Sequence, residues 1–479
     1  MKNLILFLIL TASVLGQSNF ITIDNGKFYD GNIPYRFVGF NAYYLQQNAA
    51  AGKYYIVDDV FTAADSFHVK VIRTWAFNDD DPAADSGAIR LSPYEFNEKG
   101  LIALDYVLFK AGVHNKRVIL TLANNHADYG GIAKYIEWGA EFANKKHLSH
   151  SDFFTDDTLK QWYKYYAETI LNRVNTYTGK AYKDDPAIFA IELINEASNP
   201  QKSPDIITGW YDEMSRYVKS IDYNHLVATG EEGYDANLSD YSNTKLCYNG
   251  EDYLFNGYKG TGYYANSSME GIDYCSFHMY PELAGFSMQA GKTWIDDHYN
   301  IAWKIMKPAL CGEVGIKEKK EEWFKYYFEE FKKSSQPGCM LWQYMHKDIM
   351  RNNDGFGFNE KDFPDLMAEI KEYALSIEND TAGVLQPAAN VSPVLYQNYP
   401  NPFTKVTTIR YLVPKDGHVK LTLYSITGQV IGVLEDTDKK KGEYEKVISI
   451  KSSALASGVY VCRLMVGGSV TALKIVLQK

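Results

Sequence analysis

The chain has 479 residues, of which 46% are hydrophobic and 23% charged, so it is long enough for more than one globular domain. Its formal net charge of −10 at pH 7 argues against a nucleic acid as its partner. The charge is unevenly distributed, because residues 395–479 contain twelve basic and six acidic side chains. This asymmetry indicates that the C-terminal part and the acidic remainder are separate bodies.

The N-terminus, residues 1–17, has the pattern of a signal peptide. Lys2 provides a positive charge, an apolar segment covers residues 4–15, and a small residue, Gly16, offers a place for cleavage. The apolar segment is too short to span a membrane, and no other stretch approaches 18 uninterrupted apolar residues. We therefore expect an exported protein without a stable membrane span.

Eight apolar runs follow within residues 18–376, and segments of helix length separate them. The runs are residues 36–45, 69–77, 116–125, 188–196, 225–233, 272–281, 307–315 and 338–346. Strands that alternate with helices predict a parallel sheet, and eight such repeats fit a (β/α)8 TIM barrel with enlarged loops. Among the separating segments, helices are expected at residues 57–67, 101–114, 156–177, 206–221 and 320–334.

The pattern stops in residues 377–393, which are small, polar and Pro-containing and therefore predict a linker. Residues 394–479 then predict a small all-β sandwich, because short alternating runs are separated by Gly, Asp and Lys turns. These runs are residues 407–413, 418–426, 445–450, 458–466 and 471–477. The five cysteines of the chain form no CxxC pair or metal-like cluster.

The barrel runs end in polar or aromatic residues, and two of these are glutamates. Glu196 closes the fourth run and Glu313 lies near the end of the seventh. Because the C-terminal ends of all barrel strands face the active site, the two carboxyls are expected to meet there. Such a pair is the minimum equipment for cleaving a glycosidic bond. In a retaining mechanism, Glu196 would be the general acid and base and Glu313 the nucleophile.

Five short motifs at the run ends, taken in order, resemble glycoside hydrolase family 5. They are Arg73 in VIRTWAF, Asn195-Glu196 in LINE, His278-x-Tyr280 in FHMYP, Glu313 in CGEVG and Trp342 in LWQY. The resemblance covers roughly residues 20–375 and implies a barrel that hydrolyses glycosides by double displacement. Neither a metal ion nor a cofactor is needed for this chemistry, and the acidic run 78–87 lacks the ligand spacing of an EF-hand loop.

Within that family, LANNHADYGG and YIEWG in residues 122–139, together with IRTWAFND, resemble the endo-β-1,4-mannanase branch. This branch implies hydrolysis of internal β-mannosidic bonds in mannan, glucomannan or galactomannan. The branch usually carries Trp directly after the paired Asn, whereas this chain carries His126. The departure weakens the substrate assignment, through the subsite preference, and does not weaken the mechanism that the resemblance implies.

The same resemblance implies roles for the remaining site residues. Asn195 would hydrogen-bond the 2-hydroxyl of the reacting sugar, a contact that strengthens in the transition state. Arg73 and Tyr280 would keep Glu313 ionised and aimed, and His278 would lie beside the acid/base. The aromatic residues and the loop histidine would contact the sugars, with Trp342 as the floor of the site and further surfaces at Trp75, Trp138, Tyr344 and His126.

Three other functions remain open from the sequence. The nearest is another β-glycanase on the same barrel, such as an endo-β-1,4-glucanase. The second, from a different class, is a non-catalytic glycan-binding surface protein. The third is a surface adhesin whose C-terminal region matters most. The presence of both carboxylates together with Asn195 and Tyr280 favours an enzyme.

The C-terminal region has its own signature. YQNYPNPF (396–403), LYSITGQVI (423–431) and GVYVCRLMVGG (458–468) resemble the type A C-terminal sorting domain of the type IX secretion system. The resemblance implies export by an outer-membrane secretion machinery. It places the protein outside a Gram-negative bacterium, either free or at the cell surface.

Overall fold

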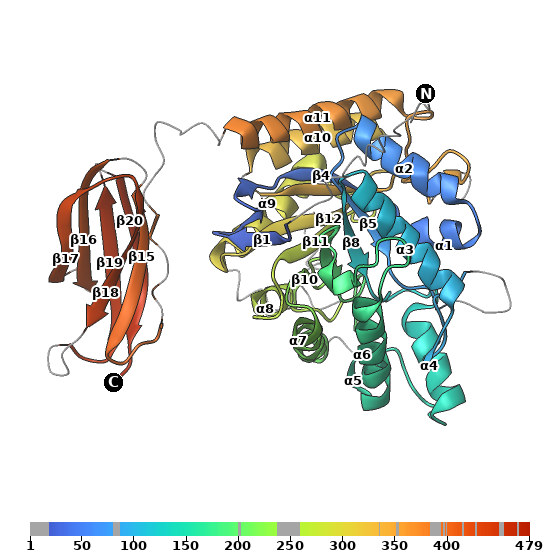
Figure 1. Cartoon of the computed structure of the whole chain (residues 1–479), viewed down its shortest axis with the longest axis horizontal. Helices are drawn as coiled ribbons and strands as arrows, with labels where there is room; N and C mark the ends of the chain where they lie inside the picture. The colour runs from blue at the N-terminus through green and yellow to red at the C-terminus, as the bar shows by residue number, and fades with distance from the viewer. Residues whose placement is uncertain are drawn as a thin grey trace, which may run out of the picture. The chain divides into compact units, whose positions relative to one another are not determined.

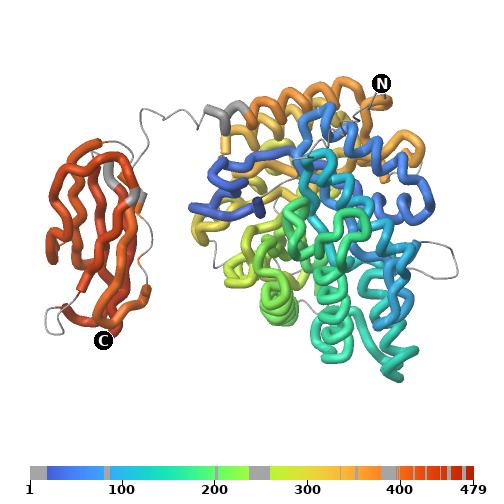
Figure 2. Tube along the Cα trace, viewed as in Figure 1, coloured from blue at the N-terminus to red at the C-terminus, as the bar shows by residue number. Residues whose placement is uncertain are grey.

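The computed structural model forms two compact units, Met1–Thr381 and Ala382–Lys479 (Figures 1 and 2). It describes residues 19–79, 87–199, 203–236, 259–334, 336–350, 354–383, 394–395, 398, 400–413, 416–426, 429–449, 455–466 and 469–479. The predicted signal peptide and most of the acidic run 78–87 lie outside these ranges. No helix in the described part of the chain is both long enough and apolar enough to cross a membrane.

Eight parallel strands form the sheet of the first unit, and they coincide with the eight predicted runs. They are β4 (Phe37–Asn41), β5 (Val71–Trp75), β8 (Arg117–Thr121), β9 (Ile188–Glu192), β10 (Leu226–Ala228), β11 (Cys275–Met279), β12 (Ala309–Gly315) and β13 (Gly338–Trp342). The last strand, β13, pairs with the first, β4, so the sheet curls into a nearly closed barrel. The predicted TIM barrel is therefore confirmed. Nearly every strand residue is buried, as expected where both faces of a parallel sheet are covered.

Helices lie on the outside of these strands (Figure 1). They are α1 (Leu45–Ala50), α2 (Tyr54–Ser66), α3 (Glu98–Val113), α4 (Gly131–Phe142), α5 (Asp152–Thr155), α6 (Asp157–Asn172), α7 (Pro204–Ile221), α8 (Tyr263–Ser268), α9 (Met288–Lys304), α10 (Lys320–Lys333) and α11 (Pro364–Gly383). The helix expected over 156–177 ends at Asn172. Arg173 is extended there and its guanidinium binds the buried carboxylate of Asp105 at 2.7 Å, which turns the chain away.

A small antiparallel sheet closes the N-terminal end of the barrel. It consists of β1 (Ile21–Asp24), β2 (Lys27–Asp30) and β3 (Ile33–Pro34). Phe28 of β2 packs edge-on against Phe189, with ring centroids 5.0 Å apart, and against Tyr274 at 5.4 Å. These rings belong to a separate apolar cluster with the first residues of several barrel strands. The opposite, C-terminal end of the strands is left open for the site.

The second unit is an all-β sandwich, as predicted. One sheet contains β14 (Val394–Leu395), β15 (Val406–Val413) and β18 (Gly442–Ser449), and the other contains β17 (Val430–Lys439), β16 (Gly417–Ser425), β19 (Gly458–Val466) and β20 (Ser469–Leu477). Alternate residues of β15 and β19 are buried in one shared core. The sequence did not predict β17. It is an edge strand with no buried residue, so it lacks the alternating pattern.

The end of the first unit differs from the predicted boundary at residue 376. Helix α11 continues through Ile377, which is fully buried, and ends at Gly383. The first residues of the predicted linker, 377–393, are therefore helical. Residues 376–382, SIENDTA, contain no helix-stopping residue, since the first Gly or Pro after Pro364 is Gly383.

We expect Phe28→Ala to lower the free energy of unfolding of the barrel by about 3–5 kcal/mol, because it leaves a cavity among three aromatic rings. Ile33→Ala, a change at a half-exposed position of the same small sheet, should cost below about 0.5 kcal/mol. Tryptophan fluorescence during denaturant unfolding isolates this unit, since all eight tryptophans lie between residues 75 and 342. If both variants lowered the free energy of unfolding equally, Phe28 would not be part of a core that closes the barrel end.

Candidate active site

Arg73, in β5, is fully buried and lies at the centre of the site. Its Nε donates to Oε2 of Glu192 at 2.6 Å, and Nη1 donates to Oε1 of Glu313 at 2.6 Å. Nη1 also donates to Asn41 at 3.0 Å, and Nη2 donates to Asn195 at 2.8 Å. Burial alone would lower the pKa of Arg73, but the charges of Glu192 and Glu313 raise it above its ordinary value. The guanidinium therefore remains charged and fixes four neighbours in place.

Glu192 was not among the predicted site residues. It ends β9, is fully buried, and also accepts a hydrogen bond from Thr121 at 2.9 Å. The signal was present in the sequence, because an ionisable residue inside an apolar strand needs a buried partner of opposite charge. Arg73 is that partner. Its guanidinium binds two carboxylates: that of Glu192, which orients it, and that of Glu313, which faces the cleft.

Glu313, in β12, is 2% exposed. Its Oε1 binds Arg73, and its Oε2 accepts a short hydrogen bond from the hydroxyl of Tyr280. Burial raises the pKa of Glu313, and the charge of Glu196 adds to the rise, which His278, Arg73 and Tyr280 oppose only in part. Burial also raises the pKa of Tyr280 well above its usual value, so its hydroxyl stays protonated and can donate. Both carboxylate oxygens are thus held.

Glu196 follows β9 in a loop, and its backbone has a positive φ of 53°. Its backbone N–H donates to the carbonyl of Gly230 at 2.8 Å, which fixes the turn. One carboxylate oxygen lies 2.7 Å from Nδ1 of His278, and the other lies 2.9 Å from Nε2 of His126. Burial acts to raise the pKa of Glu196, but the hydrogen bonds to His126 and His278 lower it well below its usual range.

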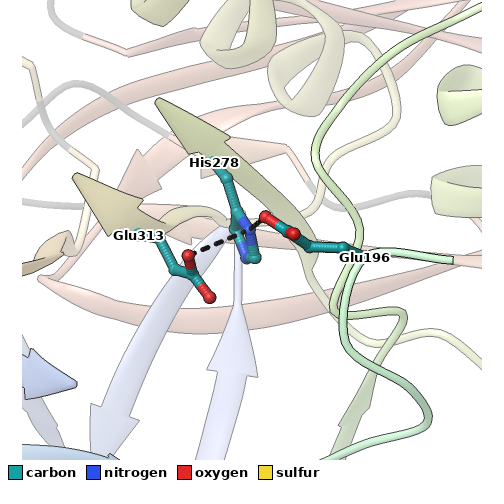
Figure 3. A group of neighbouring side chains, drawn as sticks. All are labelled: Glu196, His278 and Glu313. Atoms are coloured by element: carbon teal, nitrogen blue, oxygen red, sulfur yellow. Dashed lines mark hydrogen bonds and ion pairs between the residues drawn. The ribbon is translucent and has the colours of Figure 1, made fainter. Parts of the chain in front are cut away.

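The two predicted glutamates meet at one point (Figure 3). One oxygen of Glu196, one oxygen of Glu313 and one ring nitrogen of His278 all lie within 4.8 Å of one another. Carboxyls about 5–5.5 Å apart are typical of retaining glycosidases, and inverting enzymes separate them further. Without substrate, however, the pKa of Glu196 is lowered and that of Glu313 is raised, which is the reverse of what a general acid and an ionised nucleophile need.

A cleft of about 570 Å³ opens over the carboxyl pair. Aromatic rings form one wall. Trp342 stacks on Tyr43 with ring centroids 5.4 Å apart, and Trp75 lies 5.8 Å from the same tyrosine ring. The indole nitrogen of Trp342 donates to Asp354 at 2.9 Å, which fixes the ring plane. Flat apolar faces beside two carboxylates suit a sugar ring, which presents C–H groups on its faces and hydroxyls at its edge.

Most of the predicted residues converge on this cleft. Its lining includes Trp75, His126, Asn195, Glu196, Tyr280, Glu313 and Trp342. Arg73 and His278 are buried directly behind the carboxyls. Trp138 and Tyr344 do not reach the cleft. Trp138 is buried in α4 against the guanidinium of Arg90 at 4.5 Å, and the Tyr344 hydroxyl binds Glu360 at 2.8 Å.

Several cleft residues were not predicted. Tyr43 lies near the end of the first run, and Asp128, Tyr129, Asp354 and Phe356 come from loops that follow the strands, where the sequence offers no periodic pattern. Glu232 also lines the cleft, and its carboxylate pairs with Lys259 at 2.8 Å. It lies in the acidic segment 231–235 at the end of the fifth run, for which the sequence suggests a place beside the cleft but no role. Burial and the nearby charge of Glu196 raise the pKa of Glu232 to about 7.

Comparisons with known proteins agree with this geometry. Residues 18–338 match the model of the glycoside hydrolase family 5 β-mannosidase-like family. A mannan endo-1,4-β-mannosidase 8 of Oryza sativa subsp. japonica is 33% identical over 368 residues, which cover 72% of this chain and 96% of that protein. A mannan endo-1,4-β-mannosidase 4 of Solanum lycopersicum is 34% identical, with coverages of 71% and 87%.

Solved structures show the same likeness. The hyperthermostable endo-1,4-β-D-mannanase of Thermotoga petrophila RKU-1 superposes with a TM-score of 0.65 at 33% identity, covering 71% of this chain and 99% of that one. The endo-1,4-β-mannanase of Rhizomucor miehei also gives a TM-score of 0.65, at 28% identity, with coverages of 75% and 100%.

The second unit has a match of its own, since residues 397–478 fit the model of a secretion system C-terminal sorting domain. The family model of the first unit covers more than half of the chain, and its matched range contains both glutamates of the cleft. The chain belongs to the β-mannosidase-like members of glycoside hydrolase family 5 and carries a C-terminal secretion sorting domain.

Proposed function

We propose that this protein is a secreted retaining endo-β-1,4-mannanase that hydrolyses internal bonds of mannan, glucomannan or galactomannan. The observation that carries the proposal is the approach of Glu196 and Glu313 within 4.8 Å at the floor of an aromatic cleft. The named activities of the relatives in rice and tomato, and of the Thermotoga structure, support mannan as the substrate.

Glu313 is the better candidate for the nucleophile, because Arg73 and Tyr280 hold both of its oxygens on rigid elements. In the first step its carboxylate attacks the anomeric carbon, and the bond to the leaving oxygen breaks. Glu196 gives its proton to that oxygen. Its side chain is 14% exposed, against 3% for Glu313, so it exchanges protons with the cleft more readily.

In the second step the roles at Glu196 reverse. Its carboxylate takes a proton from a water molecule, whose oxygen attacks the anomeric carbon and releases Glu313. Two inversions give net retention, so the first product is the β-anomer. Asn195, which Arg73 and Asn124 orient through hydrogen bonds of 2.8 and 3.2 Å, is placed to bind the 2-hydroxyl.

Glu313→Ala is expected to abolish turnover while polysaccharide binding survives, because the nucleophile is lost but the aromatic wall is not. Glu196→Gln should lose about 10²–10⁴-fold on mannan and much less on aryl glycosides whose leaving groups need no proton. Steady-state kinetics and affinity electrophoresis measure both effects. Wild-type rates in either variant would contradict the assignment.

The sequence predicts both Trp342 and Trp138 as sugar contacts, but only Trp342 belongs to the aromatic wall of the cleft. Trp342→Ala is expected to reduce kcat/KM by about tenfold or more, because it removes the surface beneath the reacting sugar. Trp138→Phe, the matched control, should leave kcat/KM within about twofold, since its ring packs on Arg90 outside the cleft. Initial rates over a range of mannan concentrations distinguish them. An equal loss in both variants would remove Trp342 from the sugar site.

An endo-β-1,4-glucanase on the same barrel is the alternative within this class. Reducing-sugar release from linear mannan, galactomannan, glucomannan and carboxymethylcellulose separates the two activities. Preferential release from carboxymethylcellulose would assign the enzyme to glucans and leave the roles of Glu196 and Glu313 unchanged.

For the second unit, we propose passage through a type IX secretion machinery in the outer membrane of a Gram-negative bacterium, with release to the medium or retention at the surface. The match to a secretion sorting domain and the separate hydrophobic core of this unit support the proposal.

Removing residues 384–479 is expected to leave kcat/KM on mannan within about twofold, because every described cleft residue lies in the first unit. In a bacterium with such a secretion machinery, the truncated enzyme should stay inside the outer membrane while the full chain leaves. Activity assays on fractionated cells measure this. Equal export of both forms would contradict a sorting role.

A further inference from the structure

Two histidines bind the carboxyl of Glu196, one at each oxygen, and they differ in their access to solvent. The side chain of His278 is 1% exposed, whereas that of His126 is 49% exposed and lines the open cleft. The backbone N–H of His126 donates to the side-chain oxygen of Asn124 at 3.2 Å, and this bond holds the loop in place. His126 therefore offers the solvent-accessible contact to the proposed acid/base.

When His126 and Glu196 together hold two dissociable protons, their 2.9 Å contact is compatible with two states that differ in the position of one proton. A charged imidazole donates through Nε2, and its partner oxygen is then ionised. A neutral imidazole with its proton on Nδ1 accepts through Nε2, and the partner carboxyl then keeps its own proton. Only the second state gives Glu196 a proton to deliver to a leaving oxygen.

The surroundings favour the charged imidazole. Among the groups that act on His126, Glu196 and Glu232 are acidic and Lys259 and His150 are basic, and Asp128 lines the same cleft. Lys259 is itself paired with Glu232 at 2.8 Å, so its charge is partly neutralised. The hydrogen bond from Glu196 is the largest influence and raises the pKa of His126 above its ordinary value, against the opposing effect of burial.

We propose that His126 is a positioning residue that competes with the leaving oxygen for the proton of Glu196 and thereby sets the acid side of the enzyme's pH profile. The inference rests on the proposed function only in taking Glu196 as the general acid. It assigns a consequence to the one residue of this loop that departs from the branch resemblance, where the indole of a tryptophan has no titratable nitrogen.

The proposal makes a specific claim about pH. Above the pKa of His126 its imidazole is neutral, and the small protonated fraction of Glu196 is then set by that carboxyl and by His278 at its other oxygen. Below this pKa, added protons occupy His126 first and leave Glu196 ionised. The rate of the wild-type enzyme therefore levels off on the acid side, where Glu196 without this second histidine would still be gaining its proton.

His126→Gln tests this claim, since glutamine keeps the polar reach to Glu196 and cannot ionise. Because His126 also lines the cleft, the ratio of kcat/KM on mannan, variant over wild type, is scaled to its value at alkaline pH. As the pH falls below the pKa of His126, this ratio of variant to wild-type kcat/KM should rise by about tenfold for each pH unit. The rise should end where Glu196 itself is protonated in the variant. With an aryl glycoside whose leaving group needs no proton, the ratio should be independent of pH.

His147→Gln is the matched control, because His147 is an exposed histidine in the segment after α4. It should leave the profile of the wild type unchanged. A His126→Gln variant whose kcat/KM on mannan differs from the wild type by the same factor at every pH would overturn the proposal, and the histidine would then act only as a sugar contact. Thermal melting of each variant verifies that the comparison is between folded proteins.

A measurement without substrate separates this proposal from the assignment of the glycan. Proton NMR titration of the imidazole of His126 in the full chain should give a pKa above 6.5, and Glu196→Gln should bring it down. Because the titration contains no substrate, its result does not depend on whether the enzyme cleaves mannan or cellulose. An equal pKa of His126 in both proteins would overturn the coupling, even in an enzyme that hydrolyses mannan as proposed.

Discussion

The buried guanidinium of Arg73 is the interaction on which the site depends. It joins residues from three strands and from the loop after β9, and its two 2.6 Å contacts lock Glu192 behind the site and Glu313 inside it. Removing such a cation would leave two buried carboxylates unpaired, at a cost of about 3–5 kcal/mol. The barrel supplies the rigidity that makes the arrangement possible, because the apolar strands and the small sheet beneath them fix where each strand ends.

The hydrogen-bond partners of the two cleft carboxyls differ in their chemistry. Glu313 is bound by Arg73, which never loses its charge, and by Tyr280, whose raised pKa keeps its hydroxyl protonated. Glu196 is bound by two imidazoles, and the pKa of each lies above its ordinary value. A nucleophile needs a constant environment, and an acid/base needs one that accepts and releases a proton. The loop position of His126 connects that second environment to solvent.

Much of this architecture could be predicted from the sequence, since apolar strand middles with polar ends specify both a parallel barrel and its catalytic face. Glu196, Glu313 and Arg73 were found in this way. Glu192 was missed because its role depends on a partner 119 residues away, and the edge strand β17 was missed because it buries no side chain. From the sequence alone, Trp138 and Trp342 are equally good candidates for stacking on a sugar. Only the three-dimensional path of α4 shows that Trp138 packs against Arg90 instead.

The central claim is that residues 196 and 313 act on one sugar ring as acid/base and nucleophile. Trapping the glycosyl-enzyme with an activated 2-deoxy-2-fluoro β-mannoside tests it most directly, because the fluorine destabilises the oxocarbenium-like transition state and slows release of the covalent intermediate. Peptide mass spectrometry should find the sugar ester on Glu313. A label on Glu196, or complete inactivation with no covalent sugar on either residue, would contradict the account.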